Sequence, residues 1–111
     1  MNRRIVEKPW GFEHIWAETE DYVGKILHIN AGHRLSKQFH EVKEETVYVL
    51  KGTLYNYDQD DNIQKFTPGQ SFHVNVGQVH RFGANESYVE IVEVSTPHLN
   101  DVVRLADDYD R

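Results

Sequence analysis

Three residues in the stretch 32–52 have the types and the spacing of metal ligands: Gln38, His40 and Glu45. Gln38 and His40 are two positions apart, so both side chains leave the same face of an extended strand. Glu45 follows a polar turn and opens the apolar run 46–50, which places it at the base of the next strand, facing back toward the other two. The stretch therefore predicts half of a metal site.

A second stretch, residues 69–85, is predicted to supply the other half. In it, His80 lies three positions after Gly77, in a second strand-turn-strand pattern. Two imidazoles, one carboxylate and one amide oxygen suit Zn, Mn, Fe, Co or Ni, so we expect one divalent ion per chain. The alternative is a barrel with an empty or weak site, because seven histidines in 111 residues produce some spacings by chance.

The rest of the sequence must position these ligands, and it reads as short strands separated by turns. Phe12, His14 and Trp16 alternate with Glu13 and Ile15, which predicts one strand with two distinct faces. Further strands are expected at 22–30, 35–40, 45–51, 53–57, 63–66, 71–74, 79–82 and 87–95. No long amphipathic helix interrupts them, so we expect an all-β double-stranded β-helix, or jelly roll, forming one domain over 1–111. On composition alone, the tail 100–111 reads as a frayed segment or a short helix.

Composition excludes several classes of function. The formal net charge of -6 argues against binding to nucleic acid, whose phosphates require a positive surface. The absence of cysteine excludes disulfides and thiolate metal ligands. No apolar run approaches the ~18 to 20 residues of a membrane span, and residues 1–8 are too polar for a signal peptide. We therefore expect a cytoplasmic protein without a membrane partner.

The two ligand stretches resemble the two motifs of the cupin superfamily, with Gln38 where most members have histidine and Asn75 where proline is usual. The chain is most similar to the isomerase domain of type II phosphomannose isomerases. The similarity lies in KPWG at 8–11, LSKQFH at 35–40, VEIVEVS at 89–95 and DVVRLADDYDR at 101–111. It implies that the metal ligands are Gln38, His40, Glu45 and His80, and that the tail forms a pocket wall.

The resemblance also implies a substrate and the residues that bind it. Four basic residues match family positions that would hold a sugar phosphate: Lys25, Lys43, Arg104 and Arg111. The implied activity is a metal-dependent aldose-ketose isomerisation, with mannose 6-phosphate and fructose 6-phosphate as the family's pair. The catalytic candidates are Glu93, His33 and Arg104, and the base is Glu93, His33 or a metal-bound hydroxide. Thr46 and Asp110 depart from the family pattern and bear on which sugar is bound.

Two other classes of function stay open at this point. One is a cupin lyase or metal-dependent dioxygenase acting on a small acid, and the other is a sugar-binding cupin without activity. We also expect a homodimer, because cupins commonly pair through an edge strand and exposed strand edges need covering.

Overall fold

The computed structural model describes residues 4–110, which form eleven strands and no helix. In this part of the chain, there is accordingly no helix that could cross a membrane. The strands are β1 (Arg4–Lys8), β2 (Gly11–Glu18), β3 (Val23–Ile29), β4 (Lys37–Phe39), β5 (Glu45–Lys51), β6 (Leu54–Tyr57), β7 (Ile63–Phe66), β8 (Ser71–Val74), β9 (Phe82–Gly83), β10 (Val89–Ser95) and β11 (Val103–Ala106).

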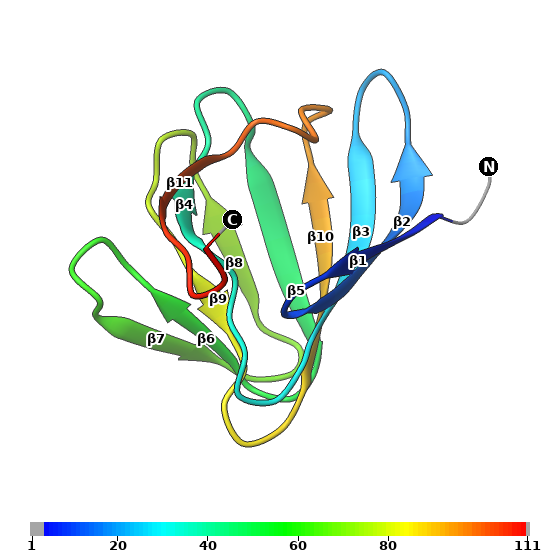
Figure 1. Cartoon of the computed structure of the whole chain (residues 1–111). Helices are drawn as coiled ribbons and strands as arrows, with labels where there is room; N and C mark the ends of the chain where they lie inside the picture. Colours follow the sequence, from blue (N-terminus) through cyan, green and yellow to red (C-terminus); the bar gives the residue numbers. More distant parts are fainter. Residues whose placement is uncertain (1–3, 111) are drawn as a thin grey trace.

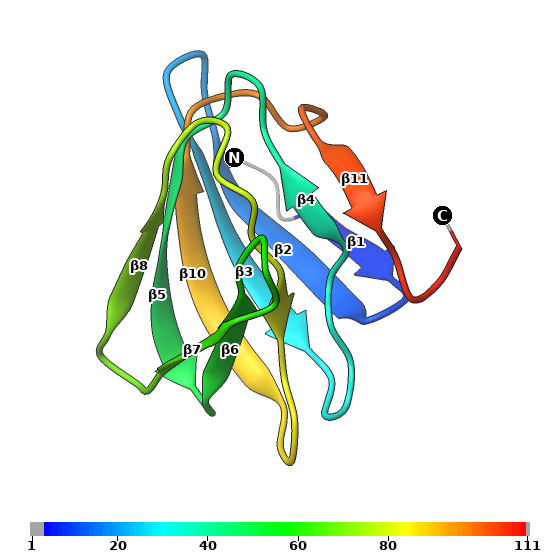
Figure 2. The ribbon, with the colours of Figure 1, turned by 90° about the vertical axis from the view of Figure 1, so that its left-hand side faces the viewer.

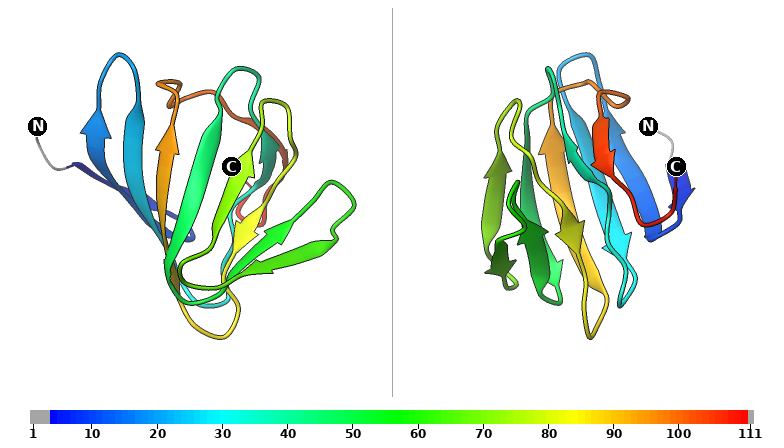
Figure 3. Two further views of the ribbon diagram at one scale, coloured as in Figure 1. Left: turned by 180° about the vertical axis from the view of Figure 1, so that it is seen from behind. Right: turned by 60° about the vertical axis from the view of Figure 1, so that its left-hand side comes forward.

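The strands make two facing walls. One is a six-stranded antiparallel sheet in the order β1-β2-β3-β10-β5-β8 (Figure 1). Facing it are the pair β11-β4 and the three strands β7-β6-β9, which single bridges at Arg34–Gly83 and Gln38–His80 join into one layer (Figure 2). This is the double-stranded β-helix that the turn spacing predicted, with the C-terminal strand closing over β4 (Figure 3).

The core lies between the walls because alternate residues of each strand point inward. Leu27, Val49 and Ile91 are nearly fully buried, and their Cα atoms are paired across β3, β10 and β5. Burying such apolar surface is the main favourable term in folding, at roughly 25 cal/mol per Å². The packed core also includes Trp10, Ile29, Val47, Leu54, Val74, Phe82, Ala84 and Val89.

Most of the expected strands are present, and three have the expected bounds: β5, β7 and β8. Gly52 makes the tight turn between β5 and β6 at a φ of 78°, where a Cβ atom would lie 2.3 Å from the carbonyl oxygen of Tyr88. The expectation for the tail was wrong, since its described part is neither frayed nor helical but forms β11, paired with β4. The expected strand 79–82 is shorter than predicted, and His80 lies just before it in an isolated bridge.

Candidate metal centre and adjoining cavity

Three of the four expected ligands form one buried cluster. His40 precedes the turn that leads into β5, Glu45 opens that strand, and His80 lies just before β9 on the facing wall. The Nε2 atoms of His40 and His80 lie 2.9 Å and 3.4 Å from the same Glu45 oxygen, Oε1. One donor atom from each residue falls within 4.8 Å of the others, which is close enough for one ion to bind all three.

The histidines are held so that Nε2 faces the cluster. The Nδ1 of His40 donates to the backbone carbonyl of Asp101, and the Nδ1 of His80 donates to the carbonyl of Gln78 at 3.1 Å. A neutral imidazole that donates through Nδ1 has its lone pair on Nε2. Two such lone pairs then face the carboxylate of Glu45, an arrangement that needs a cation between them. A divalent metal ion fits this donor set.

Gln38 lies beside this cluster. Its backbone is bonded to that of His80 in both directions, N to O, at 3.0 Å and 2.9 Å. Its side-chain amide nitrogen donates to the Ser36 hydroxyl at 2.9 Å, which leaves the amide oxygen as the atom suited to a cation. The geometry is compatible with Gln38 as a fourth ligand, and that role stays a prediction.

The surroundings of Glu45 decide its charge. Burial by itself would raise its pKa, but the polar contacts with His40 and His80 and the charge of Lys43 outweigh burial and hold the pKa of Glu45 well below its ordinary value. The carboxylate is therefore ionised, as a metal ligand must be.

A buried ion pair adjoins the cluster on the six-stranded sheet. The Nζ of Lys43 lies 3.1 Å from Oε2 of Glu93, and both side chains are about 95% shielded from solvent. Burial and the charge of Glu45 raise the pKa of Glu93 to about 8. Burial opposes the charge of Lys43, but Glu93 and Glu45 outweigh it and raise the pKa of Lys43. Lys43, expected at the phosphate, thus lies beside the candidate metal centre with its Nζ against the carboxyl group of Glu93.

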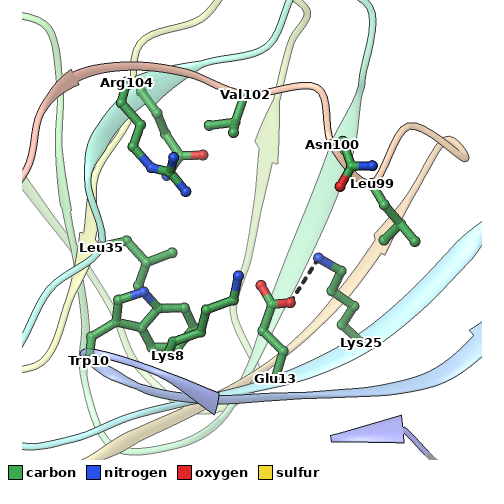
Figure 4. A pocket seen from close by; sticks show the side chains of 10 residues that line it. Lys8, Trp10, Glu13, Lys25, Leu35, Leu99, Asn100, Val102 and Arg104 are labelled. Carbon is green, nitrogen blue, oxygen red and sulfur yellow. Dashed lines mark hydrogen bonds and ion pairs between the residues drawn. The ribbon is translucent and has the colours of Figure 1, made fainter. Parts of the chain in front are cut away.

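A cavity of about 310 Å³ opens next to the cluster (Figure 4). Gln38, which lies beside the cluster, is one of the cavity's lining residues, whereas His40, Glu45 and His80 are not and are each no more than 3% exposed. The cavity is bounded by β1 and β2, by β3, and by the segment that leads into β11. Its lining residues are Lys8, Trp10, Glu13, Lys25, Leu35, Gln38, Leu99, Asn100, Val102 and Arg104.

The cavity is positively charged in a chain of net charge -6. Lys8, Lys25 and Arg104 face Glu13, which gives the lining a net charge of +2. Lys25 is paired with Glu13 at 3.3 Å, but Lys8 and Arg104 have no carboxylate partner within residues 4–110. Figure 4 shows the ends of both long side chains directed into the cavity. An anionic ligand is the natural complement.

Some of the other predicted site residues line the cavity and some do not. Lys25 and Arg104 line the cavity, as expected of substrate-binding residues, and the tail does form part of its wall. His33 is not among the lining residues, because its Nδ1 is bonded to the Tyr109 hydroxyl at 2.8 Å and the two rings stack. Thr46 bonds His73 at 2.9 Å. Arg111 lies outside the described residues.

Sequence reasoning missed two residues that the structure places at the site. Lys8 was given no role of its own beyond the KPWG motif, although it lines the cavity. Asp101 was treated only as part of the tail, yet its backbone carbonyl accepts the hydrogen bond from His40. The available signal for Lys8 was its place directly before the Pro-Trp-Gly turn, and Asp101 had none beyond the family resemblance.

Comparison with known proteins identifies the family of this chain. A family model described as the cupin domain matches residues 25–95, which include both ligand stretches, 32–52 and 69–85. The chain belongs to the cupin family. A curated relative, quercetin 2,3-dioxygenase of Bacillus subtilis (strain 168), is 32% identical over 68 residues. That alignment covers 61% of this chain and 20% of the relative, so the chain spans about one fifth of that protein's length.

Solved structures agree on the fold. The polyketide cyclase RemF from Streptomyces resistomycificus superposes with a TM-score of 0.82 at 18% identity, covering 98% of this chain and 82% of that one. A sugar phosphate isomerase of the cupin superfamily from Silicibacter pomeroyi superposes with a TM-score of 0.70 at 16% identity, covering 78% and 59%. At such identities these similarities establish a shared fold, and the different names show how many chemistries it carries.

Proposed function

We propose that this cupin is a metal-dependent aldose-ketose isomerase of a sugar phosphate, with mannose 6-phosphate and fructose 6-phosphate as the first pair to test. The observation that carries the proposal is the cavity of net charge +2, whose lining residue Gln38 is bridged to His80 of the candidate metal centre. Such a cavity suits a ligand with an anionic group at one end and oxygens for a cation at the other. The type II phosphomannose isomerase motifs and the isomerase among the structural neighbours support this choice.

The chain's own residues divide the work by position. Lys8 and Arg104, the two cavity cations without carboxylate partners, hold the phosphate through charge-assisted hydrogen bonds. Lys25, paired with Glu13 at 3.3 Å, is the third basic residue of the lining. A divalent ion bound by Gln38, His40, Glu45 and His80 would supply Lewis-acid polarisation of the sugar's carbonyl. The leucine and tryptophan of the lining, Leu35 and Trp10, exclude water from one side of the cavity.

The isomerisation moves a proton between C1 and C2, and we assign Glu93 to that transfer. Its Cα is paired with that of cavity-lining Lys25, and its carboxylate lies between Lys43 and Glu45. His33 is the weaker candidate, because its Nδ1 is bonded to the hydroxyl of Tyr109 and it does not line the cavity. Glu93→Gln should lose nearly all turnover and keep the metal, whereas His33→Gln should keep most of its activity.

The test is a coupled isomerase assay on a panel of sugar phosphates, after chelation and reconstitution with Zn, Mn, Fe, Co or Ni. Turnover of one phosphorylated sugar, with little on its unphosphorylated form, would support the proposal. No turnover in any metal, combined with tight sugar binding, would instead identify a sugar-binding cupin.

A dioxygenase is the second candidate, and the curated quercetin 2,3-dioxygenase relative favours it. The two functions differ in their co-substrate. A dioxygenase consumes oxygen and depends on a redox-active metal, whereas the isomerase works anaerobically. Oxygen uptake with a small aromatic or acidic substrate would move the assignment to this class.

A further inference from the structure

The turn between the two ligands His40 and Glu45 is held from outside by one segment of chain. This segment, residues 96–102, connects β10 to β11. Thr96 accepts a hydrogen bond from the amide of Glu44 at 3.0 Å. The carboxylate of Asp101 accepts hydrogen bonds from the three amides that precede Glu44. The loop amides therefore have side-chain acceptors instead of backbone partners.

The carboxylate of Asp101 fits into this turn like a bound anion. Its Oδ1 accepts from the amide of Glu41 at 3.1 Å, and its Oδ2 accepts from the amides of Val42 and Lys43 at 2.7 Å and 2.8 Å. Three consecutive backbone N–H groups that converge on one carboxylate form an anion-binding concavity. Here the anion is supplied by the chain itself.

The same residue orients a ligand through its backbone. The carbonyl oxygen of Asp101 accepts the Nδ1 hydrogen of His40, which directs the Nε2 of that histidine toward Glu45. Asp101 thus fixes both the ring of His40 and the turn that leads from His40 to Glu45. Its neighbours Asn100 and Val102 line the cavity, so the metal centre and the cavity wall share this anchor.

We propose that Asp101 is the positioning residue of the metal centre, holding His40 and the ligand turn in the geometry that binds a divalent ion. The inference rests on the metal-binding part of the proposed function and is independent of the substrate. Partners of this kind, which touch a ligand and not the ion, typically change metal affinity by about 10- to 100-fold when they are removed.

The chain offers a matched control in Asp58. Its carboxylate also accepts backbone amides, those of Asp60 and Asn62 at 2.9 Å, but in the β6–β7 turn, which carries no ligand. If Asp101 only stabilises a loop, Asp101→Ala and Asp58→Ala should behave alike. If Asp101 positions the ligands, only its replacement should weaken metal binding.

The experiment measures the dissociation constant for Zn²⁺ by competition with a chromophoric chelator, and amide hydrogen exchange of the metal-free proteins. Asp101→Ala should raise the Kd for Zn²⁺ by about 10- to 100-fold and speed exchange at Glu41, Val42 and Lys43. Asp101→Asn, which keeps an oxygen for two of the three amides, should show a smaller rise. Asp58→Ala should speed exchange in its own turn and leave the Kd unchanged.

An unchanged Kd in Asp101→Ala, together with faster exchange in the ligand turn, would overturn the proposal. Should the alanine variant fail to fold, Asp101→Asn decides: an unchanged Kd for Zn²⁺ together with faster exchange at Glu41, whose amide loses its acceptor, would equally overturn the proposal. A wild-type protein that binds no Zn²⁺ would refute both this inference and the metal-dependent function. A wild-type protein that binds Zn²⁺ without isomerase activity would refute the proposed function alone.

Discussion

The inner face of the barrel changes character halfway along three neighbouring strands. Toward one end β3, β10 and β5 bury only apolar side chains, and toward the other they bury charged side chains as well. The paired residues Leu27, Ile91 and Val49 belong to the first layer, and Lys25, Glu93 and Glu45 belong to the second. The apolar layer supplies the stability, whereas the charged layer costs desolvation energy and carries the chemistry.

The charged layer is tolerated because each of its carboxyl groups has a polar partner. Glu13 is paired with Lys25 and Glu93 with Lys43, while Glu45 faces the two imidazoles of the candidate metal centre. Breaking one pair would leave a buried charge without its partner, which is far more costly than deleting both. The difference between the layers teaches that a barrel can separate its folding and its function along the same strands, and this separation can be tested.

The largest expected effect is on metal content. His80→Ala removes one of the three clustered ligands, and a site that loses a ligand binds its ion weakly. Elemental analysis of the purified variant should find no stoichiometric metal, against roughly one divalent ion per chain in the wild type. His98→Ala, at an exposed histidine between β10 and β11, is the control and should keep its ion. Full metal content in both His80→Ala and His40→Ala would contradict the assignment.

The next effect concerns the apolar layer. Ile91→Ala should lower the free energy of unfolding by about 2–5 kcal/mol, because it leaves a cavity beside Leu27 and Val49. Chemical denaturation of the metal-free protein measures this. The folded fraction should bind Zn²⁺ as tightly as the wild type does, since the two layers have separate tasks. If Ile91→Ala weakened Zn²⁺ binding as well as lowering the free energy of unfolding, the two layers would not be independent.

A smaller effect is expected at the cavity. Arg104→Ala should raise the KM for a sugar phosphate about ten- to a hundredfold, since a hydrogen bond to a charged group contributes about 1.5–3 kcal/mol. Metal content should not change, because Arg104 does not belong to the cluster. Lys8→Ala should act in the same direction. Arg4→Ala, at an exposed arginine paired with Glu18, is the matched control. An unchanged KM in both Arg104→Ala and Lys8→Ala would refute the proposed phosphate site.

The sequence predicted the fold and the spacing of the candidate ligands within each stretch because both are encoded locally, whereas the link from Glu45 to His80 was expected only from the pairing of the two stretches. Alternation defines inward and outward faces, so Glu45 at the base of β5 was placed correctly. The environment of Lys43 was not predictable, since its pairing with Glu93 joins positions 50 apart on different strands. The tail was misread on composition alone, because β11 is only four residues long, is mostly exposed and forms by pairing with β4.

The smallest effect concerns the clamp that fastens the far end of the tail. Asp108 accepts hydrogen bonds from Arg34 at 2.7 Å and from the buried Arg81 at 3.0 Å, and neighbouring Tyr109 packs against the apolar core. The hydrogen bond from Arg34, followed by the charge of Arg81, holds the pKa of Asp108 below its ordinary value of 3.8. A lowered pKa in the folded state means that the clamp stabilises the protein above pH 3.8 and loses its effect as the pH falls through the folded-state pKa.

Asp108→Asn should therefore lower the free energy of unfolding at pH 7 by under about 1 kcal/mol, because the carboxylate is partly exposed and screened by solvent. Denaturation at several pH values should show the difference from the wild type shrinking below pH 3.8. Arg34→Met should give a smaller effect with the same pH dependence, since it removes one of the two ion pairs of Asp108 and leaves the one with Arg81. Zn²⁺ affinity should stay at the wild-type value in both variants, because this clamp serves the apolar layer. A difference that persists unchanged to pH 2 would show that Asp108 acts through packing instead of charge.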